Sequence, residues 1–193
     1  MVRSGSLTLA PEVDDLRHQF EKISADADAL VTPLTDQQFN WRPASESWSV
    51  AECVEHLNVT ARMYLPKLDH AIADAIRRGR YGEGPFRYSW LGRWFARMQE
   101  PPAKFRVKAP KTFQPGPTRS RSEIMAAFRA YQVQYIDRLR QANGLDLARA
   151  YVASPAAAWL RFSLGSGFEL MAAHERRHLW QARRVTEQPQ FPR

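Results

Sequence analysis

Two histidines four residues apart carry the clearest chemical signal in this chain. They lie in the string His174-Glu-Arg-Arg-His178, within a stretch whose apolar residues recur every three or four positions. If the stretch is helical, with about 3.6 residues per turn, this spacing places both imidazoles on one face. Two imidazoles arranged in this way can bind the same metal ion.

A third histidine, His56, lies in a separate stretch with helical spacing, on the side next to its apolar stripe. Three neutral imidazoles leave one coordination position open to water, which is typical of a catalytic metal site. The ion would lower the pKa of that water. The predicted metal ligands are therefore His56, His174 and His178. We expect the remaining histidines, His18 and His70, to lie on solvated faces.

Other interpretations of the same residues remain open. His174 and His178 could be ordinary polar residues on an arginine-rich helix, and His56 could be a hydrogen-bonded core histidine. The string also matches the zinc-protease pattern H-E-x-x-H, in which Glu175 would be the general base, but it does not continue into the extended signature. A di-iron site would need a second Glu-x-x-His helix, which the sequence lacks.

Two polar residues are candidates for orienting the metal-binding imidazoles. Glu52 precedes His56 by one helical turn, and Gln181 follows His178 by three residues. Either side chain could hold the second ring nitrogen of a ligating histidine, a common role for the neighbours of metal ligands. Glu52 has a competing role, because Ser49-Val-Ala-Glu52 is a capping box that would begin a helix.

Three further residues lie close to these motifs in sequence. Cys53 would face the same side of its helix as His56, where it could be a fourth ligand, a reactive thiol or a small buried core residue. Trp41 and Trp48 could wall the site or pack the turn that contains them. We expect Cys53 to be a small buried core residue and the two tryptophans to pack their turn.

Four stretches of helical periodicity must position these residues. They span about 11–32, 49–79, 120–143 and, beginning at Ser163 or Ser166, the residues up to Thr186. No alternation of period two runs along the chain, so we expect an all-α fold. The spacing predicts a four-helix bundle with a long crossover between the second and third helices. We expect one domain over residues 1–193.

Composition excludes several classes of protein. Of the 193 residues, 44% are hydrophobic and 25% are charged, which is not the balance of a disordered chain. The single cysteine excludes an internal disulfide and any multi-cysteine metal site. No apolar run approaches the ~20 residues of a membrane span, and the first residues lack the apolar block of a secretory signal. We expect a cytoplasmic protein without a membrane partner.

The net charge of +8 comes from one segment of the chain. Residues 77–129 contain thirteen basic and three acidic residues, a local charge of +10, and the remainder carries −2. Within this segment, the predicted crossover, residues 80–118, is rich in proline and aromatic residues, with a short helix expected near Trp90 to Met98. Arginines interleaved with aromatic rings could stack bases and neutralise phosphates. We expect instead that the aromatics form a lid packed on the bundle, with the arginines as its solvated face, and so we expect no nucleic-acid partner.

Two stretches of this sequence resemble the DinB-like family of metalloenzymes. They are LTDQQFNWRPASESWSVAECVEHL at residues 34–57 and FELMAAHERRHLWQARRV at residues 168–185. The resemblance implies a four-helix bundle in which His56, His174 and His178 form a triad that binds nickel or zinc. It also implies relatives that use a low-molecular-weight thiol such as mycothiol or bacillithiol in transfer and isomerisation reactions.

These observations together predict a divalent-metal-dependent enzyme that acts on a small molecule. The expected reaction is thiol-dependent S-transfer or hydrolysis, and a homodimer is a further expectation. The alternative is a non-enzymatic module that binds nucleic acid or another anionic partner through residues 77–129. A metal-free bundle that serves as an interaction scaffold is a third hypothesis, because a fold does not by itself establish a reaction.

Overall fold

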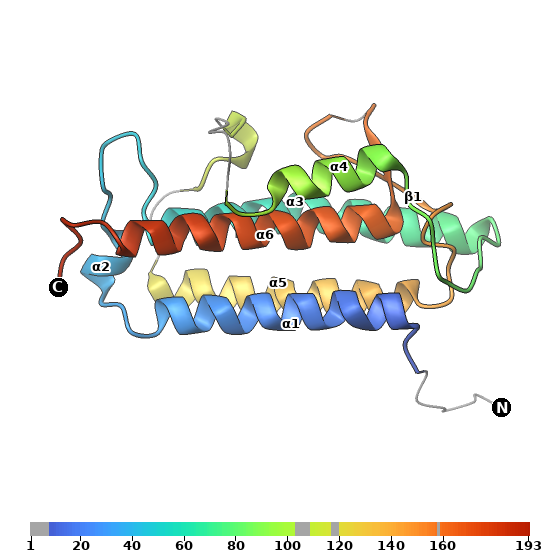
Figure 1. The fold of residues 1–193 in the computed structure, drawn as a ribbon, viewed down its shortest axis with the longest axis horizontal. Helices are drawn as coiled ribbons and strands as arrows, with labels where there is room; N and C mark the ends of the chain where they lie inside the picture. The colour runs from blue at the N-terminus through green and yellow to red at the C-terminus, as the bar shows by residue number, and fades with distance from the viewer. Residues whose placement is uncertain (1–7, 103–108, 117–119, 158) are drawn as a thin grey trace.

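The computed structural model describes residues 8–102, 109–116, 120–157 and 159–193 (Figure 1). Four long helices dominate it: α1 (Pro11–Val31), α3 (Val50–Arg77), α5 (Arg121–Ala142) and α6 (Leu164–Thr186). The expected all-α bundle is therefore confirmed. No helix among the described residues is both long enough and apolar enough to cross a membrane.

The four long helices form two layers, with α1 and α5 in one and α3 and α6 in the other (Figure 1). Within the bundle, α3 packs on α5 and α6, and α1 packs on the same two helices. Helix α3 continues through Pro66 to Arg77. The core includes the stacked rings of Phe20 and Tyr135, whose centroids are 4.8 Å apart. The site-bearing helices α3 and α6 are thus direct neighbours.

Helix ends follow the capping residues in the sequence. Ser49 and Ser120 both form complete capping boxes, so α3 and α5 begin where the sequence predicts. The side chain of Ser163 caps α6, which decides between the two predicted starts of that helix. Gly79 and Gly144, with φ of 61° and 86°, follow the ends of α3 and α5, where only glycine adopts a positive φ without strain.

A short helix and a two-stranded hairpin were not predicted. Helix α2 (Asp36–Asn40) precedes the loop that leads into α3. Strands β1 (Tyr151–Ala153) and β2 (Arg161–Ser163) pair antiparallel, with Val152 opposite Phe162, and β2 leads directly into α6. These elements are three to five residues long, too short to show a periodic pattern in the sequence. The hairpin fixes the start of α6.

The crossover from α3 to α5 contains helix α4 (Trp90–Gln99) and a 3₁₀ turn, η1 (Lys111–Phe113). The expected short helix is therefore present, and it packs along α6 (Figure 1). Positions 103–108 and 117–119 of the predicted crossover lie outside the described residues. Of its described aromatic rings, those of Phe86, Tyr88, Phe95 and Phe113 pack against the bundle, whereas Tyr81, Trp90 and Trp94 are exposed.

Glycines on α4 and α6 allow the crossover to lie close to the bundle. A Cβ atom at Gly92 would lie 2.6 Å from the Ser166 hydroxyl oxygen. A Cβ atom at Gly165 would overlap the ring of Tyr88, the residue just before the cap of α4. Both glycines are therefore needed for space rather than for backbone conformation.

We predict that Gly165→Ala lowers the free energy of unfolding by about 1–3 kcal/mol, because the Tyr88 ring must move. The intrinsic helix propensity of alanine acts in the opposite direction by about 1 kcal/mol. In a Tyr88→Ala background the overlap is gone, so the same substitution should be neutral or stabilising. Urea denaturation of the four proteins measures this coupling. Equal effects of Gly165→Ala in both backgrounds would contradict the packing described here.

Candidate metal site

Three histidines from two helices meet between α3 and α6. His56 comes from α3, and His174 and His178 come from successive turns of α6. One ring nitrogen of each lies within 4.8 Å of one in each of the other two, and they are the only such group of three among the described residues. The Nε2 atoms of His56 and His174 are 3.1 Å apart. Two nitrogens that each bind one ion at about 2.1 Å lie about 3.0–3.4 Å apart, so this pair already has ligand spacing.

The hydrogen bond of His56 determines which of its nitrogens can bind a metal. Its Nδ1 atom lies 2.6 Å from the Phe113 carbonyl oxygen in η1. A carbonyl oxygen only accepts, so Nδ1 must carry the proton and donate. In the neutral ring, Nε2 then has its lone pair free and directed toward His174. A backbone carbonyl that accepts from the outer nitrogen is a usual partner of a metal-binding histidine.

His174 also has an oxygen atom near its Nδ1 atom, at a longer distance than in His56. Its Nδ1 atom lies 3.5 Å from the side-chain oxygen of Gln99, at the end of α4. If this nitrogen donates, two lone pairs face each other across 3.1 Å and repel unless a cation lies between them. The third ring, His178, has a buried Nδ1 atom with no hydrogen-bond partner among the described residues. The donor set and its unmet hydrogen-bonding capacity fit a divalent cation.

Burial keeps the three imidazoles neutral. Desolvation lowers the pKa of His56, against a smaller opposing effect of the hydrogen bond to Phe113. Desolvation, together with His56 and Arg177, lowers the pKa of His174 to about 3. The pKa of His178 is held well below its usual value, first by desolvation and then by the charges of His174, His56 and Arg177. Neutral imidazole is the form that binds metal.

Of the two residues proposed to orient the triad, Gln181 lies beside a histidine and Glu52 does not. Glu52 does not contact His56: it accepts from the Ser49 backbone at 2.9 Å and from Arg42 at 2.8 Å, so its capping role excludes the orienting one. The Phe113 carbonyl takes the place expected for Glu52. Gln181 does lie beside His178, where its side chain opposes the lowering of the pKa of His178.

The structure also distinguishes between the roles considered for Cys53 and the two tryptophans. Cys53 is fully buried, outside the histidine group, and burial raises the pKa of its thiol, so the ligand and reactive-thiol interpretations were wrong. Trp48 does wall the site, with its ring centroid 4.9 Å from that of His56 and 5.8 Å from that of His178. Trp41 packs edge-on against Phe191 instead.

Glu175 faces away from the site. Its Oε1 atom accepts a hydrogen bond of 3.1 Å from Gln132 on α5, inside the bundle. Desolvation raises its pKa to about 8, against opposing effects of Gln132 and Arg176. It is not part of the histidine group. The metalloprotease interpretation, which needs Glu175 as a base beside the ion, therefore has no geometric support.

Sequence reasoning missed Phe113 and Gln99 as partners of the triad. Both lie in the crossover, and each contacts one histidine through its outer nitrogen. A backbone carbonyl leaves no signature in residue type, so Phe113 could not have been identified from the sequence. Gln99 could have been suspected only if the docking of α4 on α6 had been known.

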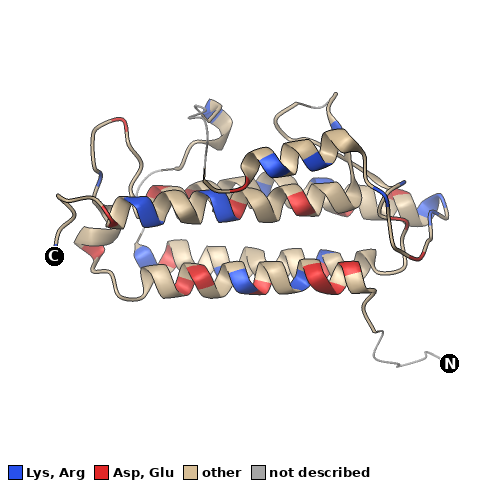
Figure 2. Ribbon diagram, viewed as in Figure 1, with Lys and Arg blue, Asp and Glu red and all other residues tan. Residues whose placement is uncertain are grey.

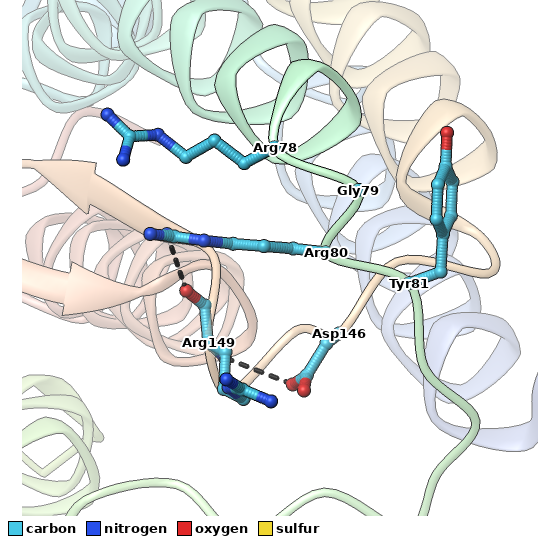
Figure 3. A pocket seen from close by; sticks show the side chains of 6 residues that line it. All are labelled: Arg78, Gly79, Arg80, Tyr81, Asp146 and Arg149. Atoms are coloured by element: carbon cyan, nitrogen blue, oxygen red, sulfur yellow. Dashed lines mark hydrogen bonds between the residues drawn. The ribbon is translucent and has the colours of Figure 1, made fainter.

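Two cavities are described, one next to the η1 turn that contacts His56 and one far from the histidines. One, of about 400 Å³, is lined by Pro115 and Gly116, just beyond Phe113, and by Glu52 and Glu55 of α3. The other, of about 320 Å³, lies at the far end of α3 (Figure 3). It is lined by Arg78, Gly79, Arg80, Tyr81, Asp146 and Arg149. Arg78 is twenty-two residues from His56, roughly 33 Å along a helix, so this second cavity belongs to another region of the surface.

Comparison with known proteins agrees with this architecture. The solved structure of YfiT from Bacillus subtilis, described as a probable metal-dependent hydrolase with an unusual four-helix bundle topology, superposes with a TM-score of 0.61 at 14% sequence identity. The match covers 95% of this chain and 91% of YfiT, and it shows a shared fold. No curated protein matches the sequence significantly. The sequence model of the DinB superfamily matches residues 19–182, and the chain belongs to that superfamily.

Proposed function

We propose that this protein is a divalent-metal-dependent enzyme whose metal ligands are His56, His174 and His178. The observation that carries the proposal is the facing pair of Nε2 atoms on His56 and His174, 3.1 Å apart, with the outer nitrogen of His56 hydrogen-bonded to a backbone carbonyl. Imidazole donors suit zinc and nickel better than calcium or magnesium, which favours those two ions.

A divalent ion held here supplies Lewis-acid chemistry and lowers the pKa of a water or thiol that reaches it. The protein's own residues do the positioning. Phe113 fixes the ring of His56 through its carbonyl oxygen, and Trp48 covers the rings of His56 and His178. Gln181 lies beside His178, three residues further along α6. Together they present neutral nitrogens in a site that is largely shielded from water.

We propose a small-molecule substrate and either hydrolysis or thiol-dependent S-transfer as the reaction. The three histidines supply only three bonds, and zinc or nickel takes four or more, so a reactant can complete the coordination. The described residues offer no fourth protein ligand in the group. The description of YfiT as a probable metal-dependent hydrolase supports hydrolysis. The thiol alternative rests on the resemblance of the sequence to the DinB-like family.

Two assays separate these reactions. Protein purified without an affinity tag or chelator is analysed for metal, and then incubated with ester and amide substrates in one assay. In the other, it is incubated with an electrophile and a low-molecular-weight thiol. Metal-dependent turnover that needs no thiol supports hydrolysis, whereas turnover only with thiol supports transfer. A metal-free protein that takes up no zinc or nickel would contradict the proposal.

We predict that His178→Ala reduces the metal content from about one ion per chain to near zero, and abolishes turnover, while the helix content stays near that of the wild type. The bundle has an apolar core that does not need an ion to fold. Elemental analysis and circular dichroism measure the two effects.

His18→Ala is the matched control, because His18 lies on α1 with a side chain 60% exposed. It should leave both metal content and turnover unchanged. An unfolded His178→Ala protein would instead indicate a structural ion, and retention of metal by the variant would exclude His178 as a ligand.

We also predict opposite effects for the two polar neighbours. Gln181→Leu should weaken metal affinity about tenfold or more, because it removes the polar group beside His178. Glu52→Ala should leave metal affinity unchanged but lower the free energy of unfolding by about 1 kcal/mol, because it removes a capping contact. Competition with a chromophoric chelator and urea denaturation measure the two quantities. A loss of metal affinity in Glu52→Ala would contradict the assigned contacts.

A further inference from the structure

Helix α4 has a second apolar face that the bundle does not use. Its inner side, with Gly92 buried and Phe95 partly buried, packs on α6 and on β2, where the Phe95 and Phe162 ring centroids are 5.4 Å apart. Positions 90, 91, 94 and 98 fall on a different side at 3.6 residues per turn. Their exposures are Trp90 72%, Leu91 37%, Trp94 48% and Met98 43%. One face of α4 is therefore packed, and another apolar face is open to water.

A third exposed tryptophan lies on the neighbouring hairpin. Trp159, in the loop between β1 and β2, is 84% exposed. That loop rises on the same side of the bundle as α4 (Figure 1). We call Trp90, Leu91, Trp94, Met98 and Trp159 the tryptophan ridge. Clustered exposed apolar residues of this size mark an interaction surface rather than ordinary surface composition.

The tryptophan ridge is not the result of a loosely held helix. Arg176 of α6 donates to Glu100 at 3.0 Å, and Arg177 donates to the Met98 carbonyl oxygen at 3.1 Å. The Ser89 side chain caps the other end of α4. The helix is thus fixed at both ends with its apolar face outward.

The charge around the tryptophan ridge is mainly positive. The two segments that form it, residues 84–99 and 151–168, contain four arginines and no acidic residue. The arginines are Arg87, Arg93, Arg97 and Arg161. Two carboxylates lie beside the ridge: Glu100 at the end of α4 pairs with Arg176, and Glu169 of α6 interacts with the charge of Arg93. Figure 2 shows basic positions along α4 on the outer side of the bundle. Tryptophan and leucine on one side of a helix with arginine beside them is the pattern of helices that lie in a membrane interface.

We propose that the tryptophan ridge docks this protein on an anionic phospholipid surface. No ridge residue lines either of the two described cavities, and a bilayer interface accepts exposed tryptophan side chains without a complementary shape. Phosphate headgroups complement the four arginines. A second copy would bring a ridge of the same charge against the first, and single-stranded nucleic acid is bound in basic grooves. The sequence-based expectation of no membrane partner rested on the lack of a spanning segment and of a secretory signal, and neither bears on docking at a bilayer surface.

Sedimentation of the protein, residues 1–193, with vesicles tests the proposal. Vesicles of phosphatidylcholine alone are compared with an equal mixture of phosphatidylcholine and phosphatidylglycerol. We expect binding to the mixture only, and weakening at raised salt. Trp90→Ala with Trp159→Ala should reduce binding at least tenfold. Arg93→Glu with Arg97→Glu should reduce it about fivefold or more for each arginine.

Matched controls distinguish binding through the ridge from nonspecific hydrophobic adsorption and from the effect of net charge. Ile76→Ala with Val133→Ala removes two comparably exposed apolar side chains elsewhere, and Arg62→Glu with Lys67→Glu makes the same charge change on α3. Both pairs should bind vesicles nearly as the wild type does. Absence of wild-type binding, or equal losses in ridge and control variants, would overturn the proposal.

Two further measurements test whether the ridge binds another partner and whether lipid binding is independent of the proposed metal site. Preferential binding of an oligonucleotide, or ridge-dependent dimerisation with no vesicle binding, would assign the surface to another partner and overturn the lipid proposal. His178→Ala should keep full vesicle binding, because the ridge does not include the triad. Failure of the metal proposal would therefore leave the membrane proposal intact, and the reverse also holds.

Discussion

The rest of the site depends on holding two imidazole nitrogens, those of His56 and His174, face to face in a dry interior. In water such rings would separate or take up protons. Here burial keeps them neutral, and the carbonyl oxygen of Phe113 fixes the proton of His56 on the outer nitrogen. The packing of α3 on α6 therefore directs the Nε2 lone pair of His56 toward the Nε2 atom of His174, at a spacing that suits two ligands of one cation. The four-residue spacing on α6 adds His178 to the same side.

The crossover completes this interior. Its η1 turn holds His56, and the end of α4 reaches His174 through Gln99. The glycines at 92 and 165 allow α4 to approach α6 closely enough for these contacts. A segment that stands out in the sequence for its charge thus contributes to the site through one backbone carbonyl and one amide. Its described arginines lie mainly at the surface, away from the histidine nitrogens.

The bundle and the grouping of the three histidines could be predicted because both depend on residues that recur at helical spacing. The capping serines at 49, 120 and 163 and the spacing of His174 and His178 are local signals that tertiary contacts did not override. For Glu52 the sequence indicated two roles, an orienting one and a capping one, and the side chain caps the helix. Sequence reasoning could not find the hairpin, whose strands are too short for a pattern, or Phe113, whose contribution is a backbone atom. Phe113 and Gln99 escaped prediction because their contacts with the histidines depend on how the crossover folds back.

The two sides of α4 connect the interior with the surface. Through Gln99 and the Arg176–Glu100 pair, α4 is tied to the turn of α6 that carries His174. Its opposite apolar face is exposed, and that exposure has a thermodynamic cost in water that packing on α6 does not relieve. If an anionic surface covers that face, the helix that contacts the triad is the one held at the membrane.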